Sequence, residues 1–548
     1  MCGIYGFTGR SDLGLVKRMA KASRKRGPDR QSTYVGKNIS LAHNHLFIQQ
    51  ADPQKVVCHP FQTKRNNILL WNGEIYGALG SDTEWLGHML DDYGASSLVS
   101  QVGMWALAFY KKQEQELHLV RDHFGTKPLF YTIVKGELVF ASTLNSLAVY
   151  PGVSFEPDED MIDVGTVFGR FVPGPRTEFK HIYKIAPGEH KVWSIRERRF
   201  THSSSMLFMP HGGVIEQEYD PEYIKSLFTH CFREGAYSPQ KTGLFYSGGL
   251  DSTAIMFGLA GLKNMNLTGF TSYSDPYEIE NRVLTRAVAD MCNIPLEEAV
   301  LNEDTYKQYN ESRSSVRFKD IYGFDIQDRR RTYPRVVMNA MAAQHGCKVV
   351  LNGDGADELF VIRDHHHTRK TNPLEFIRNY PSLVYSRGRN MKAAAVKAGE
   401  YMMSWLPVDL FCDDVSTNMR VVDLIGLGEM YNTLSDSIAG YFSMESRPLY
   451  FHQSLAFRVM FMAPSLKPTY VIPQWQKIWP HSMPKHILTK AFEKDFILHK
   501  RLFNKKVGWA VDIPHRLKTE SYKKNQNKMY DTRYKNQVFD LFRRHNDS

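Results

Sequence analysis

The pattern of apolar residues changes once along this chain, and the change limits the folds that the chain can adopt. From Cys2 to about Trp193, short β-like runs such as "NNILLWNGEIYG" and "GELVFAST" alternate with turns of Gly, Pro and Asn. Further on, strand-like runs alternate with helix-like runs: "TGLFY" precedes "STAIMFGLAG", and "KVVL" ends in "NGDGADE". The first pattern predicts a β-rich two-sheet domain, and the second predicts a parallel sheet covered by helices.

We therefore predict an α/β chain of 548 residues with two domains. An α+β two-sheet sandwich covers residues 2–193, and a doubly wound parallel-sheet domain with a helical extension covers residues 219–520. The polar stretch "SIRERRFTHSSS" lies at the start of the predicted linker, residues 194–218. Residues 521–548 form a basic tail, which we interpret as solvated surface, with a binding role as the alternative.

The net charge, the cysteines and the apolar runs of the chain narrow the classes of function. The chain has 69 Lys and Arg residues against 58 Asp and Glu residues, so its net charge is +11. This charge favours anionic partners, among which ATP is as good a candidate as nucleic acid. The six cysteines form no CxxC pair, which argues against a disulfide framework and a structural zinc site. No apolar run reaches the roughly 18 residues that cross a bilayer, and we expect a soluble cytoplasmic protein.

A glycine turn follows the first predicted strand of the second domain, in "LFYSGGLDSTAI". Two adjacent glycines let a ligand approach the backbone, and the amides at the start of a helix supply donors for phosphate. The acidic side chain that follows could hold a magnesium ion between phosphates. The pattern predicts a pyrophosphate site, and it lacks the GK[ST] of ordinary kinases and GTPases.

An acidic turn follows a second strand, in "VVLNGDGADELF", where Asp354, Asp357 and Glu358 cluster around two glycines. Such a density of acids is repulsive unless a cation or a proton-transfer role offsets it. The alternative is a solvated acidic turn. Because the carboxyl ends of parallel strands meet at one edge of a sheet, one nucleotide could touch both turns.

The opening "MCGIYGFTG" places a thiol beside the amino end of the chain. If Met1 is removed, the α-amino group of Cys2, with an ordinary pKa of about 7.7, can take the proton of the thiol. Taken alone, this cysteine could equally be an incidental small hydrophobe.

Together these stretches resemble the glutamine-dependent asparagine synthetases over nearly the whole length of the chain. In the first half the resemblance is carried by "MCGIYGFTG", "RGPD", "NGEIYG", "SDTE" and "RDHFGTKPLFY". In the second half it is carried by "SGGLDST", "LNGDGADELF", "ESRP" and "MPKHIL", in the order of the family. The resemblance implies a class II amidotransferase, in which an Ntn-hydrolase-like glutaminase domain is joined to a PP-loop synthetase domain.

The resemblance also implies a reaction. Glutamine is hydrolysed at Cys2, and ammonia passes inside the protein to a second site. There ATP, with Mg²⁺, adenylates aspartate, which is amidated to asparagine with release of AMP and pyrophosphate. We expect small-molecule substrates (glutamine, aspartate and ATP), no membrane and no nucleic acid, with a homodimer left open. The alternatives are a related amidotransferase that acts on a different carboxylate, and a catalytically idle basic binding protein, which the acid clusters argue against.

The resemblance assigns residues to roles. The catalytic residues are Cys2, Asn72, Gly73, Asp354 and Lys485. The glutamine-binding residues are His45, Ile48, Asn72, Gly73, Glu74 and Asp82. The ATP- and pyrophosphate-binding residues are Leu244, Ser247, Gly248, Gly249, Asp251, Ser252, Asn352 and Gly353. Asp251 and Asp357 correspond to magnesium ligands, and Arg330 to a residue near the acceptor carboxylate.

The chain departs from the family pattern in several places. His45 stands where the family usually has an arginine that binds the α-carboxylate of glutamine, and histidine is shorter and mostly neutral. We therefore expect weaker or rearranged glutamine binding. The segment between Glu74 and Asp82 is shorter than usual, and "DELF" continues as "VIRDHHH". These three histidines favour a polar surface over a metal site, because consecutive helix positions do not face one another. The departures near the acceptor side leave the identity of the acid open.

Overall fold

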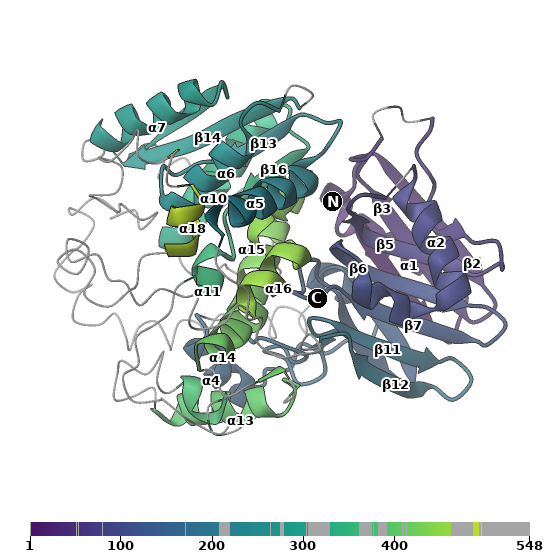
Figure 1. The fold of residues 1–548 in the computed structure, drawn as a ribbon. Helices are drawn as coiled ribbons and strands as arrows, with labels where there is room; N and C mark the ends of the chain where they lie inside the picture. Colours follow the sequence, from purple (N-terminus) through teal and green to yellow (C-terminus); the bar gives the residue numbers. More distant parts are fainter. Residues whose placement is uncertain are drawn as a thin grey trace.

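The computed structural model describes residues 2–207, 220–304, 329–360, 375–461 and 486–495, apart from short gaps at 51, 53, 79, 170, 263–264, 275–278, 303, 376, 382–391, 408–409, 412–414 and 493–494. Two layered units lie side by side in Figure 1, and helices α15 (Gly428–Tyr441) and α16 (Gln453–Met460) lie between them. The N-terminal unit holds two antiparallel sheets and the C-terminal unit holds one parallel sheet. The predicted α/β class is confirmed.

The first six-stranded sheet has the order β10-β8-β9-β1-β3-β2. Its strands are β1 (Gly3–Thr8), β2 (Arg30–Gly36), β3 (Ile39–His45), β8 (Phe130–Val134), β9 (Glu137–Ala141) and β10 (Tyr183–Lys184). Helix α1 (Leu13–Lys21) begins after Asp12, whose side chain accepts a hydrogen bond from the Leu15 amide. This helix and α3 (Leu144–Leu147) cover the outer face of the sheet.

The second six-stranded sheet has the order β12-β11-β7-β6-β5-β4. Its strands are β4 (Phe61–Gln62), β5 (Ile68–Ile75), β6 (Gly103–Lys111), β7 (Glu116–Arg121), β11 (Glu189–Ser194) and β12 (Arg199–Ser205). Helix α2 (Asp82–Tyr93) and the turn η2 (Ala95–Ser100) pack on its outer face. Apolar residues of both sheets form the core between them. Because β6 is covered on both faces, it is buried along nearly its whole length and its sequence reads as an unbroken apolar run.

The predicted linker begins with a strand. Residues 199–205 pair with β11 as the antiparallel edge strand β12, so the second sheet extends past residue 194. Most residues of β12 are exposed, which explains why its polar sequence resembles a linker. Residues 208–219 and 496–548, which include the predicted basic tail, lie outside the described residues.

The parallel sheet has the order β15-β14-β13-β16-β17. Its strands are β13 (Thr242–Phe245), β14 (Leu267–Ser274), β15 (Leu296–Leu301), β16 (Val349–Asn352) and β17 (Glu445–Pro448). The chain runs outward from β13 through β14 to β15, and then returns to the other side of β13 with β16. The strand order therefore reverses between β13 and β16, and such a switch point opens a crevice at the carboxyl ends of the two strands.

The helices around the parallel sheet include those predicted from the sequence. They are α5 (Pro221–Ala236), α6 (Leu250–Leu259), α7 (Ile279–Met291), α10 (Arg329–Gln344), α11 (Ala356–Phe360) and α18 (His486–Ala491). The remaining described segments are α4 (Glu159–Val167), α13 (Lys392–Met403), α14 (Val415–Val422), the short 3-10 helices η1 (Arg24–Arg26) and η6 (Leu449–Phe451), and the π-helix η5 (Asp423–Leu427). Cys231 lies on the buried face of α5. Within the described part of the chain, no helix has the length and apolar character needed to cross a bilayer.

Candidate active sites

Cys2 directly precedes β1 and contacts β5 and the segment after β3. Its backbone N–H donates to Asn72 Oδ1 at 2.9 Å, from β5, and its carbonyl accepts from Arg26 Nε at 3.2 Å. Cys2 Sγ lies 3.9 Å from the carbonyl oxygen of Leu46, just after β3. Burial raises the pKa of the Cys2 thiol, so a thiolate forms here only if a nearby base takes the proton.

Two of the predicted catalytic residues, Asn72 and Gly73, are adjacent on β5. Asn72 is fully buried, and its Nδ2 has no hydrogen-bond partner although its Oδ1 binds Cys2. Gly73 pairs with Trp105 of β6, and a Cβ at this position would lie 2.0 Å from the Met104 carbonyl oxygen. Only glycine therefore fits here. A buried amide donor without a partner, next to a thiol, has the arrangement of an oxyanion donor.

The other predicted glutamine-binding residues lie on α2, at the end of β3 and in the segment after β3. Asp82 is the first residue of α2, and burial raises its pKa to about 7. Burial lowers the pKa of His45 to about 2, and its ring centroid lies 5.1 Å from those of His43 and His59. His45 is therefore neutral near pH 7, and it cannot supply the charge of the arginine that it replaces. Ile48 is buried.

The carboxylate of Glu74 lies at the boundary between the two domains. Its Oε1 accepts from Arg447 Nη2 of β17, which also binds Glu445 at 3.0 Å through Nε. Burial raises the pKa of Glu74, and the charge of Arg447 opposes that shift. One oxygen of Glu74 is thus already bound to the second domain.

The glycine turn and the acidic turn both lie at the switch point of the parallel sheet. The glycine turn follows β13, which contains buried Leu244, and the acidic turn follows β16. These strands are directly paired, with Leu244 opposite Leu351. A Cβ on Gly353 would lie 3.7 Å from the Cβ of Asp251, so the two turns face each other.

The glycine turn has room for an anion. Gly248 has a φ of +70°, and a Cβ there would lie 2.4 Å from Thr285 Cγ2. Helix α6 starts after Gly249 without a side-chain cap, which leaves its first amides for a ligand. The Ser247 and Ser252 hydroxyls lie 3.1 Å apart across the turn. This cradle fits a phosphate.

The acids of the site fit a magnesium ion that phosphates would share. Asp251 is partly buried and Asp357 is exposed. Among the described residues, no group of three or more His, Cys, Asp or Glu side chains could hold a metal ion by itself. Magnesium commonly takes only one or two carboxylates and completes its shell with phosphate oxygens and water.

Asp354 has partners that the sequence did not suggest. Its carboxylate is held by Arg335 of α10 and Ser435 of α15, and its backbone N–H donates to Asn352 Oδ1 at 3.0 Å. Asn352 Nδ2 in turn donates to Ser446 Oγ at 3.0 Å. Neither Arg335 nor Ser435 belongs to a recognisable motif.

A buried polar interface joins the two sites. Arg26, which binds the Cys2 carbonyl, pairs with Asp436 at 2.8 Å, and Lys127 lies 3.5 Å from the same carboxylate. Asp436 directly follows Ser435 on α15, which also packs between the units in Figure 1. Apolar Leu46, Ile48 and Phe124 of the first domain belong to the core of the second domain. None of these residues was predicted to lie at an interface between the domains, although Ile48 was predicted to bind glutamine.

Two predicted residues cannot be placed. Lys485 lies outside the described residues. Arg330 lies on α10, but its side chain is also outside the description. The histidines of "VIRDHHH" lie outside it as well.

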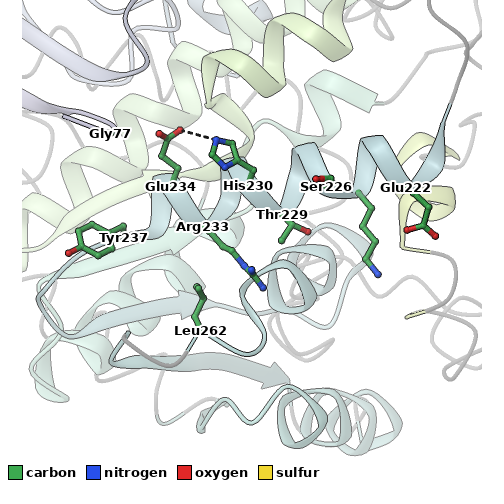
Figure 2. Close-up of a pocket in the computed structure, with 10 residues that line it drawn as sticks. Gly77, Glu222, Ser226, Thr229, His230, Arg233, Glu234, Tyr237 and Leu262 are labelled. Carbon is green, nitrogen blue, oxygen red and sulfur yellow. Dashed lines mark ion pairs between the residues drawn. The ribbon is translucent and has the colours of Figure 1, made fainter. Parts of the chain in front are cut away.

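A cavity of about 760 Å³ follows α5 and contains none of the predicted site residues (Figure 2). Its cations have partners: Arg233 donates to the carbonyls of Gly258 and Ala260, and Lys225 pairs with Asp495 at 2.6 Å. Because none of the predicted site residues lines this cavity, we do not assign it to either candidate site.

Comparison with known proteins divides the chain in the same way. The glutamine amidotransferase domain family matches residues 1–204, and the asparagine synthase family matches residues 223–546. Glutamine-hydrolyzing asparagine synthetase 2 of Bacillus subtilis is 27% identical over 287 residues, which cover 46% of this chain and 38% of that protein. A putative glutamine-hydrolyzing asparagine synthetase 1 of Methanocaldococcus jannaschii is 26% identical over 354 residues, which cover 61% of this chain and 59% of that protein. Amidase chry2 of Gibberella zeae is 20% identical over 370 residues, which cover 61% of this chain and 53% of that protein. The chain thus matches between 38% and 59% of the length of these relatives.

Proposed function

The chain belongs to the asparagine synthase family, and from this premise we propose that it is an ATP- and glutamine-dependent asparagine synthetase of the cytoplasm. Its glutaminase domain extends through β12, and its synthetase domain contains the parallel sheet. Its substrates are glutamine, aspartate and ATP, with Mg²⁺ as the metal, and it needs no membrane or nucleic acid.

One observation supports this proposal more strongly than any other. The glycine turn and the acidic turn meet at the switch point between β13 and β16, where one nucleotide can contact both. The second domain therefore has the shape of an ATP site, while the first has a thiol beside an unpartnered amide donor.

In the first site, the terminal amine of Cys2, exposed by removal of Met1, takes the thiol proton. The thiolate then attacks the side-chain amide carbon of glutamine. Asn72 Nδ2 and the Gly73 backbone N–H donate to the oxygen on which negative charge develops, and each such donor is worth about 3 kcal/mol. The C–N bond breaks as the leaving nitrogen takes the proton from the Cys2 ammonium group, so ammonia departs and a thioester remains. Water then hydrolyses the thioester to glutamate and the free thiol.

The ammonia must stay inside the protein, because in water near neutral pH it becomes ammonium, which has no lone pair for attack. The buried interface around Arg26, Lys127 and Asp436 lies between the two sites. We infer that ammonia crosses here.

In the second site, a bound magnesium ion would be held by Asp251 and Asp357, and it would neutralise charge on the phosphates. The glycine turn holds the phosphates, and Arg330 and Lys485 are assigned to the acceptor carboxylate and the adenylated intermediate. The ammonia lone pair forms the new C–N bond, the acyl C–O bond breaks with its electrons leaving on AMP, and one N–H proton passes to Asp354.

A second candidate function keeps this chemistry and changes the acceptor acid. The match to a protein named an amidase, together with the departures near the acceptor side, favours keeping this candidate. Pyrophosphate release with ATP, Mg²⁺ and a panel of acids separates the two. Release that depends on aspartate supports the first function, and release with another acid alone supports the second. No release with any acid would refute both.

A further inference from the structure

Arg335, an arginine that no motif marks, grips the carboxylate of Asp354 with both arms of its guanidinium group. Nη1 donates to Oδ2 at 2.8 Å, and Nη2 donates to Oδ1 at 2.6 Å. This bidentate geometry fixes the plane of the carboxylate as well as its position.

Ser435 adds a third bond to the same carboxylate. Arg335 Nη1 lies 2.6 Å from Ser435 Oγ, and Ser435 Oγ lies 2.7 Å from Asp354 Oδ2. A guanidinium nitrogen can only donate, so the serine oxygen accepts from Arg335 and donates its own proton to Asp354. The carboxylate is therefore held from two different helices, α10 and α15.

We call Arg335 and Ser435, together with the Asp354 carboxylate that they hold, the clamp. The clamp is largely shielded from water. The side chains of Arg335 and Asp354 are 17% and 11% exposed, and the guanidinium lies 6.0 Å above the Tyr431 ring. Of the other titratable groups, Glu358 on α11 and Tyr431 act on Arg335, Asp357 on α11 and Asp423 on η5 act on Glu358, and Asp251 on α6 lies beside Gly353. Because these neighbours are acids, the positive charge of Arg335 offsets the repulsion that an ionised Asp354 would meet.

We propose that Arg335 and Ser435 are the positioning residues of the synthetase site, and that they act by holding the Asp354 carboxylate in one orientation beside Gly353. This inference rests on the proposed function. Both arms of Arg335 already bind Asp354, so Arg335 acts through that carboxylate and is not the receptor of the acceptor acid.

The fixed carboxylate has a defined use. When it accepts a hydrogen bond from one N–H of ammonia, the lone pair is directed away from it, toward the acyl carbon. The same oxygen then receives the proton as the C–N bond forms and AMP leaves. An orientation error of about 1 Å in such a group lowers the rate by about 100-fold.

The first test uses the full chain with ATP, Mg²⁺, aspartate and ammonia in place of glutamine. We expect Arg335→Gln to lower kcat by about 100-fold, with the KM values for ATP and aspartate changed by less than about threefold. Arg335→Lys keeps the positive charge but cannot make the two parallel hydrogen bonds of a guanidinium group. We expect its kcat to be about tenfold higher than that of Arg335→Gln. The matched control is Arg378→Gln, which removes an exposed pair with Glu400 (3.5 Å, side chains 55% and 61% exposed) and should leave kcat unchanged.

A double variant separates positioning from a merely structural role. If Arg335 acts only through Asp354, then Arg335→Gln combined with Asp354→Asn is no slower than Asp354→Asn alone. A further loss of about 100-fold in the double variant would overturn the proposal. A large rise in the KM for aspartate with kcat unchanged would also overturn it, because Arg335 would then bind the acceptor itself.

A second measurement does not depend on activity. In thermal unfolding without substrates, we expect Arg335→Gln and Asp354→Asn each to lower Tm by about 2–4 °C, and the double variant to lose less than the sum. Additive losses would show that the two groups are not paired. If the wild-type chain releases no pyrophosphate with any acid, the proposed function fails, and the unfolding data alone decide whether the clamp exists.

Discussion

Asn72 offers a sharp test of the thiol site, because its side chain does two separate things. Oδ1 accepts the Cys2 backbone N–H at 2.9 Å, and Nδ2 is buried without a partner. Asn72→Asp keeps the acceptor for Cys2 and removes the donor, whereas Asn72→Ala removes both. If Asn72 is an oxyanion donor, the two variants lose a similar amount.

The size of the loss follows from the removal of one donor in a buried site. Such a donor is worth about 2.7–4 kcal/mol in the transition state, so we expect kcat for glutamine hydrolysis to fall by about 10²–10³ in both variants. The carboxylate of Asn72→Asp also repels the developing oxyanion, so this variant should be at least as slow as Asn72→Ala.

The assay is glutamate release from glutamine, run beside ammonia-supported pyrophosphate release. The second rate should stay within about twofold of wild type, because ammonia bypasses the thiol site. The control is Asn67→Ala, which changes another buried asparagine of the same domain, bonded to Asp91. If Asn72→Asp keeps glutaminase activity within tenfold of wild type, Asn72 only anchors Cys2 and the oxyanion argument is refuted.

Four further outcomes are expected. Cys2→Ala abolishes glutamine-supported turnover and spares ammonia-supported turnover; loss of both would contradict the separation of the sites. His45→Arg restores a charge for the α-carboxylate and lowers the KM for glutamine by about tenfold or more, since a hydrogen bond to a charged group contributes about 1.5–3 kcal/mol; an unchanged KM would show that this carboxylate binds elsewhere. If Asp82 binds the α-ammonium group of glutamine, it must be ionised to do so, and because burial raises its pKa to about 7, kcat/KM for glutamine falls as pH drops below about 7; Asp82→Asn should lack this fall, and a fall that persists would assign it to another group. Gly248→Ala places a methyl group 2.4 Å from Thr285 Cγ2, so the KM for ATP rises while glutaminase activity holds; unchanged ATP binding would place the phosphates away from this turn.

The residues that the sequence could predict are those whose role depends on the backbone nearby. Gly73 and Gly248 stand where a side chain would collide with a neighbour, and short motifs carry that constraint. The two turns could be placed at one sheet edge because parallel strands meet there. Roles that resemblance alone assigns, such as that of Asp357, stay predictions.

The pairings that the sequence could not predict form only through tertiary packing. Arg335 and Ser435 are 100 residues apart, and Glu74 and Arg447 are 373 apart. No local pattern links such pairs. Strand β12 was missed for the opposite reason: it is an exposed edge, so it lacks the apolar alternation that marks a strand.

The contacts of Glu429 limit how the two domains can move relative to each other. Its carboxylate, fully buried on α15, binds Arg121 at 2.6 Å, Lys184 at 3.1 Å and the Gly174 amide at 2.7 Å, all from the first domain. Swinging the domains apart would break these three contacts together and would expose Leu46, Ile48 and Phe124, which pack in the core of the second domain. The two domains are thus held in one arrangement before any substrate binds.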